Sequence, residues 1–143
     1  MTMRKILLSI AMTIAVIHVS AQSDNEVFRA YLYNNEYDVY LRIDFYDESI
    51  DVPGNELYGK LPGFLGKKNN SFCWPITTVK LKDKNTAEIS LINDFGSEDF
   101  KATLTLEKDS VYVLRHIKGS TLKVPNNGKW QKLPKLLPFK RKP

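Results

Sequence analysis

Apolar and polar residues alternate along much of the chain, and the alternation is clearest between Tyr37 and Tyr46. Successive side chains of a β-strand point to opposite faces of the sheet, so one set of alternating residues faces one way and the other set faces away from it. The apolar set is Tyr37, Val39, Leu41, Ile43 and Phe45, and the more polar set is Asp38, Tyr40, Arg42, Asp44 and Tyr46. The pattern predicts a strand with one buried face.

The same two-residue period recurs in six further segments. These predicted strands are Val27 to Tyr33, Ile76 to Lys82, Thr86 to Ile92, Phe100 to Glu107, Val111 to Ile117 and Thr121 to Val124. Several of them are joined by short segments rich in Asn, Asp, Gly and Ser, which let a strand reverse within a few residues. The sequence therefore predicts an all-β fold, an antiparallel meander of about 7–8 strands that forms a small, lipocalin-like barrel or a sandwich.

One stretch, from Pro53 to Pro75, breaks this rhythm. It holds three of the seven prolines and four of the seven glycines, together with many aromatic and aliphatic residues. We predict a long loop here, and long loops in compact domains usually carry function. The loop either packs as a lid over one end of the barrel or presents an apolar surface to a partner, and the two roles are compatible. The candidate binding residues are Leu57, Tyr58, Leu61, Phe64, Leu65, Phe72 and Trp74.

The N-terminus has a different composition from the rest of the chain. A short basic start that ends at Lys5 precedes a mostly apolar run from Ile6 to Val19, and small residues follow up to Ala21. This is the layout of a secretory signal peptide, and the run is shorter than the roughly 20 apolar residues that span a bilayer. We predict a signal peptide over residues 1–21, a single all-β domain over residues 22–143, and a periplasmic or secreted protein.

Charge divides the chain unevenly. The formal net charge is +5 at pH 7, all sixteen acidic residues lie at or before Asp109, and nine basic residues follow from Arg115 onwards. We therefore predict a basic C-terminal strand or tail over residues 125–143. It either contacts an anionic partner or folds back beside the acidic part of the chain. We favour folding back, because the basic residues are interleaved with apolar residues that favour burial.

The same features exclude two classes of partner. An exported chain whose larger part is acidic is not expected to bind nucleic acid. The C-terminal segment has the tryptophan, leucines and lysines of a membrane-surface segment, but Pro134 and Pro138 interrupt a regular amphipathic helix there. Stable membrane insertion is therefore not expected.

Residues that carry catalytic chemistry are few. His116 is the only histidine beyond the predicted signal peptide, and Cys73 is the only cysteine. A catalytic pair would need His116 beside Cys73 or a serine, with an acid to orient it, and no nucleophile motif surrounds either residue. The usual zinc site needs three or four His or Cys ligands, and the acidic turns lack the spacing of a calcium loop. We predict no enzymatic activity, no cofactor and no metal.

Three segments resemble small exported all-β proteins of the Bacteroidota. They are Gly96 to Leu106, Gly119 to Val124, and Gly128 to Pro134, and the predicted signal peptide, which ends in Ser-Ala before Gln22, is similar as well. Most members of that group have no assigned activity. The resemblance implies that some relatives are lipocalin-like barrels and that others protect against toxins in the periplasm.

These observations favour an exported, non-enzymatic binding protein. The leading hypothesis is a protein-binding role of the inhibitor or toxin-immunity type, in which the partner is a toxin or a secreted enzyme. The alternative is a lipocalin-like carrier that holds a small apolar ligand inside the barrel, with residues 53–75 as its lid.

Overall fold

The computed structural model describes residues 26–54, 56–108 and 110–143. The predicted signal peptide and the first residues of the predicted domain, up to residue 25, lie outside these ranges. The regular structure within them is strand, apart from the short 3-10 turn η2 (Glu56–Tyr58). No helix in the described part of the chain is long and apolar enough to cross a membrane. The prediction of an all-β fold is confirmed.

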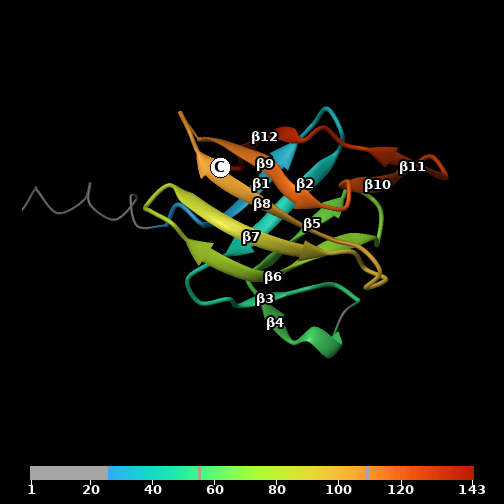
Figure 1. Cartoon of the computed structure of the whole chain (residues 1–143), viewed down its shortest axis with the longest axis horizontal. Coiled ribbons are helices and arrows are strands. Elements are labelled where there is room, and N and C mark those ends of the chain that lie inside the picture. The colour runs from blue at the N-terminus through green and yellow to red at the C-terminus, as the bar shows by residue number, and fades with distance from the viewer. Residues whose placement is uncertain (1–25, 55, 109) are drawn as a thin grey trace, which may run out of the picture.

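Eight strands close into an antiparallel barrel (Figure 1). They are β1 (Arg29–Asn34), β2 (Val39–Asp44), β5 (Gly63–Lys67), β6 (Cys73–Leu81), β7 (Thr86–Ile92), β8 (Asp99–Leu106), β9 (Val111–Gly119) and β12 (Leu136–Arg141). Each strand pairs with the next in this order, and β12 pairs with both β9 and β1, which closes the sheet. The predicted meander is confirmed, and its form is a barrel rather than a sandwich.

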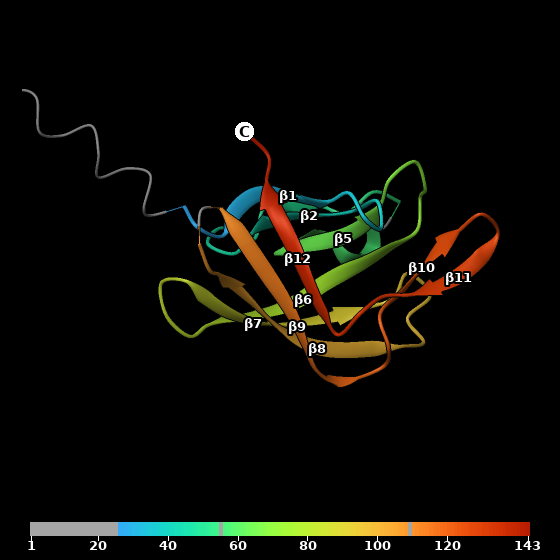
Figure 2. The same ribbon diagram turned by 90° about the horizontal axis from the view of Figure 1, so that it is seen from above.

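Two small hairpins extend from the barrel. One consists of β3 (Ile50–Asp51) and β4 (Lys60–Leu61) in the connection from β2 to β5, and the other consists of β10 (Lys123–Asn126) and β11 (Lys129–Lys132) between β9 and β12. Figure 2 shows the second hairpin projecting away from the barrel. Its turn residues Asn127 and Gly128 have positive φ angles of 52° and 77°, as a tight two-residue hairpin turn requires.

The predicted basic segment, residues 125–143, contains β11 and β12. On β12 the side chains of Leu137 and Phe139 are buried in the barrel, while their neighbours along the strand are exposed. The Arg141 guanidinium reaches back to β1, where its Nη2 donates to the carbonyl oxygen of Arg29 (3.2 Å). This part of the chain is thus a barrel strand, along which buried and exposed residues alternate.

Side chains fill the barrel interior. The rings of Phe28 and Phe45 stack with centroids 5.2 Å apart, and Phe28 lies edge-on to Tyr112 at 6.5 Å. On the other side of the core, Trp74 contacts the ring of Phe100 at 5.2 Å. A barrel of eight strands has an interior just wide enough for side chains to fill. The interior of this barrel is accordingly its hydrophobic core.

Tyr112 makes the clearest hydrogen bond inside that core. Its hydroxyl donates to the carbonyl oxygen of Val27 (2.5 Å), and burial raises the pKa of the tyrosine. Tyr112→Phe should lower the free energy of unfolding by about 1–2 kcal/mol, because the buried carbonyl loses its donor. Urea denaturation measures this, with Tyr33→Phe on the outer face as the control. Equal midpoints for the two variants would show that the hydrogen bond adds no net stability.

The prediction of one long loop from Pro53 to Pro75 is wrong. The stretch contains η2, β4, β5 and the start of β6. The glycines suggested a loop, but one of them lies within a strand, where it allows close packing against the neighbouring strand. Gly66 on β5 pairs with Tyr40 on β2, and a Cβ at Gly66 would lie 2.5 Å from Cζ of the Tyr40 ring. A glycine there lets the tyrosine ring lie flat across the neighbouring strand.

Candidate functional site

The structure divides the seven predicted binding residues among three places. Leu65, Phe72 and Trp74 belong to the main core, with exposed fractions of 0%, 7% and 0%. These three side chains are therefore not available to a partner on the surface. Leu61 and Phe64 pack in a second, smaller apolar cluster, while Leu57 and Tyr58 are exposed.

The smaller cluster lies on the outside of the barrel. It joins residues of the β3–β4 hairpin and its flanks to the outward-facing residues of β2, β5 and β6: Ile50, Val52, Phe64 and Cys73, with Tyr40 and Leu61 against them. On β5, Leu65 points into the main core and Phe64 points into this cluster. Much of the stretch from Pro53 to Pro75 is thus part of the barrel wall and of a layer packed on it.

Three aromatic side chains meet at one end of the barrel, and we call them the aromatic rim: Phe72, Phe95 and Trp130. The centroid of Phe72 lies 5.0 Å from Trp130 and 5.9 Å from Phe95, and the latter two rings are 6.5 Å apart. Phe72 is buried beneath the other two, whereas Phe95 is 72% exposed and Trp130 is 51% exposed. Large aromatic groups exposed in this way are typical of interaction surfaces.

The turn that carries Phe95 is held firmly. Asn93, at its base, is buried, and its Oδ1 accepts hydrogen bonds from the backbone N–H groups of Ser97 (2.9 Å) and Glu98 (3.3 Å). The backbone N–H of Gly96 donates to the carbonyl oxygen of Asn93 (2.9 Å). These bonds close the turn around Phe95, so the backbone that carries the exposed ring is held in place before any partner binds.

An ion pair ties the Trp130 hairpin to the same end of the barrel. Lys123 of β10 places its ammonium 3.0 Å from Oε1 of Glu98 and 5.9 Å from the centroid of Trp130. In addition, Nε1 of the buried Trp74 donates to the carbonyl oxygen of Lys123 (2.9 Å). The projecting hairpin is therefore linked to the barrel through both the main chain and the side chain of Lys123.

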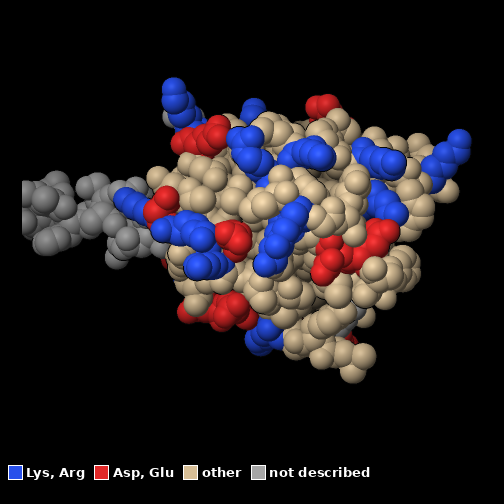
Figure 3. Space-filling view, in the orientation of Figure 1, with Lys and Arg blue, Asp and Glu red and all other residues tan. Residues whose placement is uncertain are grey.

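Leu57 and Tyr58 lie across a hollow from the turn that carries Phe95. Leu57 is fully exposed, Tyr58 is 40% exposed, and both line an open hollow of about 590 Å³ that Asp94 also borders. Asp94 directly precedes Phe95 in the turn, so the hollow reaches the turn that carries the Phe95 ring. The lower right of Figure 3, where η2 lies, is mostly uncharged.

The sequence interpretation named Leu57 and Tyr58, which are exposed, among its candidate binding residues, but it did not name Phe95 or Trp130. A signal for both was present. Phe95 is an apolar residue in the polar turn Asn93-Asp94-Phe95-Gly96-Ser97, and Trp130 follows the turn pair Asn127-Gly128. A large ring beside a tight turn is often exposed, because the polar turn itself faces water.

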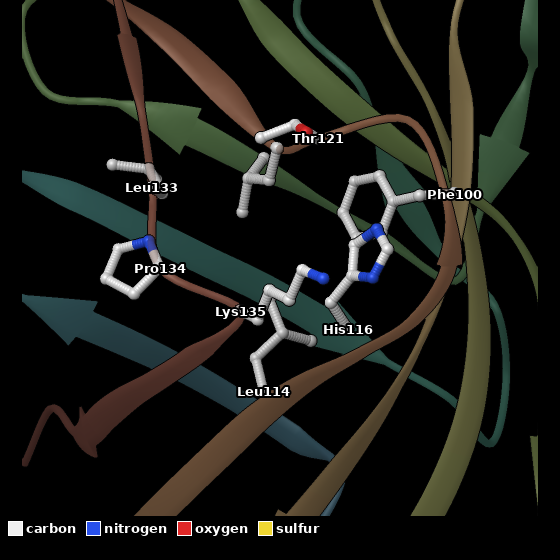
Figure 4. Close-up of a pocket in the computed structure, with 8 residues that line it drawn as sticks. Phe100, Leu114, His116, Thr121, Leu133, Pro134 and Lys135 are labelled. Carbon is white, nitrogen blue, oxygen red and sulfur yellow. The ribbon is translucent and has the colours of Figure 1, made fainter.

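His116 lies at the end of the barrel core and lines a small cavity of about 20 Å³ (Figure 4). Its ring stacks on Phe100 with centroids 5.5 Å apart, and its Nε2 lies 3.0 Å from the carbonyl oxygen of Ser120. A cavity of this size holds about one water molecule. Cys73 is buried in the outer cluster, whereas Phe100, on which His116 stacks, belongs to the main core.

The Asp44 carboxylate, in the acidic turn after β2, binds groups of the protein itself. Asp44, 3% exposed, accepts hydrogen bonds from Ser49 Oγ (2.5 Å) and from two backbone N–H groups, and it lies 3.4 Å from Nε of Arg29. Among the residues that the structure describes, no three His, Cys, Asp or Glu side chains gather in a group that could hold a metal ion.

Comparison of the chain with protein-family models, with curated proteins and with solved structures finds no match. The resemblance to exported proteins of the Bacteroidota stays a prediction, and the case for function depends on the surfaces of the barrel itself.

Proposed function

We propose that this chain is an exported, non-enzymatic binding protein that docks on another protein through the aromatic rim. The observation that carries the proposal is the exposure of Phe95 and Trp130 on a fixed base. Residues that dominate protein interfaces are rich in tryptophan and other aromatic groups that fill pockets on the partner. Side chains held in place beforehand lose little conformational freedom on binding.

The surroundings of the aromatic rim favour a partner with a mixed surface. Lys129 and Lys132 flank Trp130 on β11 and are exposed, whereas Asp94 and Glu56 border the hollow next to Leu57. Charged groups around an apolar centre speed association and select the orientation of the partner. The partner that fits is a toxin or secreted enzyme with an apolar pocket, an acidic margin that faces the lysines and a basic margin that faces Asp94 and Glu56. The protein would act as its inhibitor or immunity factor.

The barrel interior weighs against the carrier alternative. Interior-facing side chains such as Leu32, Ile89 and Leu104 are at most 1% exposed, and the cavity beside His116 has room for about one water molecule. A small apolar ligand would have to displace part of the core. Native mass spectrometry of the purified protein tests this alternative, because a retained small molecule would favour the carrier.

Alanine substitutions at Phe95 and Trp130 test the docking proposal. Each should weaken partner binding by about tenfold or more, because truncating a central aromatic contact costs over 1 kcal/mol. Capture from a periplasmic extract identifies the partner, and calorimetry with the purified partner gives the dissociation constants. Both variants should remain folded. Phe95→Ala should keep the wild-type unfolding midpoint because Phe95 is mostly exposed, whereas Trp130→Ala should lower it modestly because half of Trp130 is buried and its ring packs on Phe72.

Leu81→Ala is the matched control. Leu81 is 46% exposed and ends β6 at the turn to β7, whereas Phe95 follows the opposite end of β7. Partner binding should be unchanged in this variant. If Phe95→Ala and Trp130→Ala bind the partner as tightly as Leu81→Ala does, the aromatic rim is not the docking surface.

A further inference from the structure

A second surface, which shares no residue with the aromatic rim, is a groove on the outer face of β1 and β2. It has a volume of about 550 Å³, within the range of small-molecule binding sites. Three tyrosines line it, and the C-terminal residues Lys142 and Pro143 border it on one side. Figure 2 shows the end of the chain leaving β12 beside β1. We call this surface the tyrosine groove.

The tyrosines are placed by the pairing of the two strands. Tyr33 lies opposite Tyr40, and Tyr31 is the next outward-facing residue along β1. The rings of Tyr31 and Tyr40 are almost parallel, with centroids 5.4 Å apart, and Tyr40 also packs edge-on against Phe64 at 5.7 Å. Burial raises the pKa of Tyr40. No ring of the described residues stacks on Tyr33, which is half-buried.

Polar groups surround these rings. The turn between β1 and β2 contributes Asn35 and Asp38, and the connection between β5 and β6 contributes Lys68 and Asn69. All four residues are exposed. Amide, carboxylate and ammonium groups thus provide both donors and acceptors within one groove.

Hydrogen bonds hold these two segments to each other. The backbone N–H of Lys68 donates to the carbonyl oxygen of Asp38 (2.8 Å), and the ammonium of buried Lys67 donates to the carbonyl oxygen of Tyr37 (2.7 Å). On the opposite side, the backbone N–H of Lys142 donates to the carbonyl oxygen of Tyr31 (2.8 Å), and its ammonium lies 5.2 Å from that ring. The polar border is therefore preorganised on both sides.

We propose that the tyrosine groove binds an oligosaccharide. A pyranose ring has an apolar C–H face that packs on an aromatic ring, and hydroxyl groups around its edge that donate and accept hydrogen bonds. The C–H face would pack on the ring of Tyr33. The hydroxyl groups would form hydrogen bonds with Asn35, Asp38 and Asn69. Tyrosine suits this role because it combines an apolar body with a polar tip.

The charge of the groove narrows the class of ligand. Among the side chains that line the groove, Lys68 and Lys142 carry positive charges and Asp38 carries a negative one, which favours a sugar with a carboxylate over a cationic sugar. A purely apolar ligand would make no use of the amide, carboxylate and ammonium groups that surround the rings. The groove is lined by polar groups as well as rings, which fits a ligand with both apolar and hydroxyl-bearing surfaces.

Four tetrasaccharides test the proposal: chitotetraose, laminaritetraose, xylotetraose and tetragalacturonate. Titration of each into the ¹⁵N-labelled protein should shift backbone amide signals of β1, β2 and the turn at residues 35–38 for at least one of them. Tyr33→Ala should then weaken that sugar by about tenfold. Asn35→Ala, which leaves all three rings in place, should weaken it as well.

Trp130→Ala is the control that separates this proposal from protein docking. It removes an aromatic ring outside the groove and should leave saccharide affinity unchanged, even though it weakens the protein partner. The absence of binding by all four sugars at millimolar concentration would overturn the proposal. So would a sugar whose affinity is the same in wild type and in a folded Tyr33→Ala variant.

Discussion

Trp74→Ala should lower the free energy of unfolding by about 3–5 kcal/mol. The indole is fully buried, packs against Phe100 at 5.2 Å and Phe72 at 6.3 Å, and donates a hydrogen bond to the carbonyl oxygen of Lys123. The substitution removes the largest fully buried side chain of the core and leaves the carbonyl of Lys123 without this donor. Domains of this size are stable by roughly 5–15 kcal/mol, so much of the stability would be lost.

Urea denaturation measures this effect. Unfolding is monitored by far-ultraviolet circular dichroism rather than by tryptophan fluorescence, because the variant lacks Trp74. Phe95→Ala is the matched aromatic control, because Phe95 is 72% exposed and its removal should change stability by less than about 0.5 kcal/mol. Similar midpoints for the two variants would contradict the burial of Trp74.

The contrast matters for any study of binding, because the sequence interpretation had proposed Trp74 as a binding residue. A loss of partner capture in Trp74→Ala would reflect damage to the fold. Only variants that remain folded, such as those at Phe95 and Trp130, report on the docking surface.

Asp44→Ala should lower the free energy of unfolding at neutral pH by about 2–3 kcal/mol. Burial opposes ionisation of this carboxyl, but hydrogen bonds from Ser49 and from the backbone N–H groups of Asp47 and Tyr46, together with the charge of Arg29, outweigh it and hold the pKa below its ordinary value of 3.8. Without the carboxylate, the N–H groups that close the turn after β2 lose their acceptor.

The lowered pKa also sets the pH dependence. A carboxyl whose pKa is lower in the folded state stabilises the fold fully at pH values above its ordinary, unfolded pKa of 3.8. This contribution is lost as the pH falls through the folded pKa. The difference in stability between wild type and Asp44→Asn should therefore shrink between pH 7 and pH 2, as measured by urea midpoints at each pH. A constant difference over that range would show that the folded pKa is not lowered.

Strands with one buried face were predictable from the sequence. The predicted strand Thr86 to Ile92 matches β7 at both ends, because buried and half-exposed residues alternate along it and turn residues follow it. Thr121 to Val124 was placed two residues early, because the small β10–β11 hairpin begins at Lys123.

The strand β5 could not be predicted in the same way. All five of its residues are buried, since the main core lies on one face and the β3–β4 layer covers the other. A short strand buried on both faces shows no alternation. Its two glycines strengthened the impression of a loop, although Gly66 is required by the ring of Tyr40.

The sequence by itself determined the all-β class and most of the barrel strands, because these depend on residues that are near neighbours in the chain. Only the tertiary structure decided which side chains share a surface. Phe72, Phe95 and Trp130 are far apart in the sequence and meet because three separate connections reach the same end of the closed barrel. Local periodicity predicts which face of a strand is buried, whereas the contacts between distant turns follow from strand order and register, which are set by the packing of the whole core.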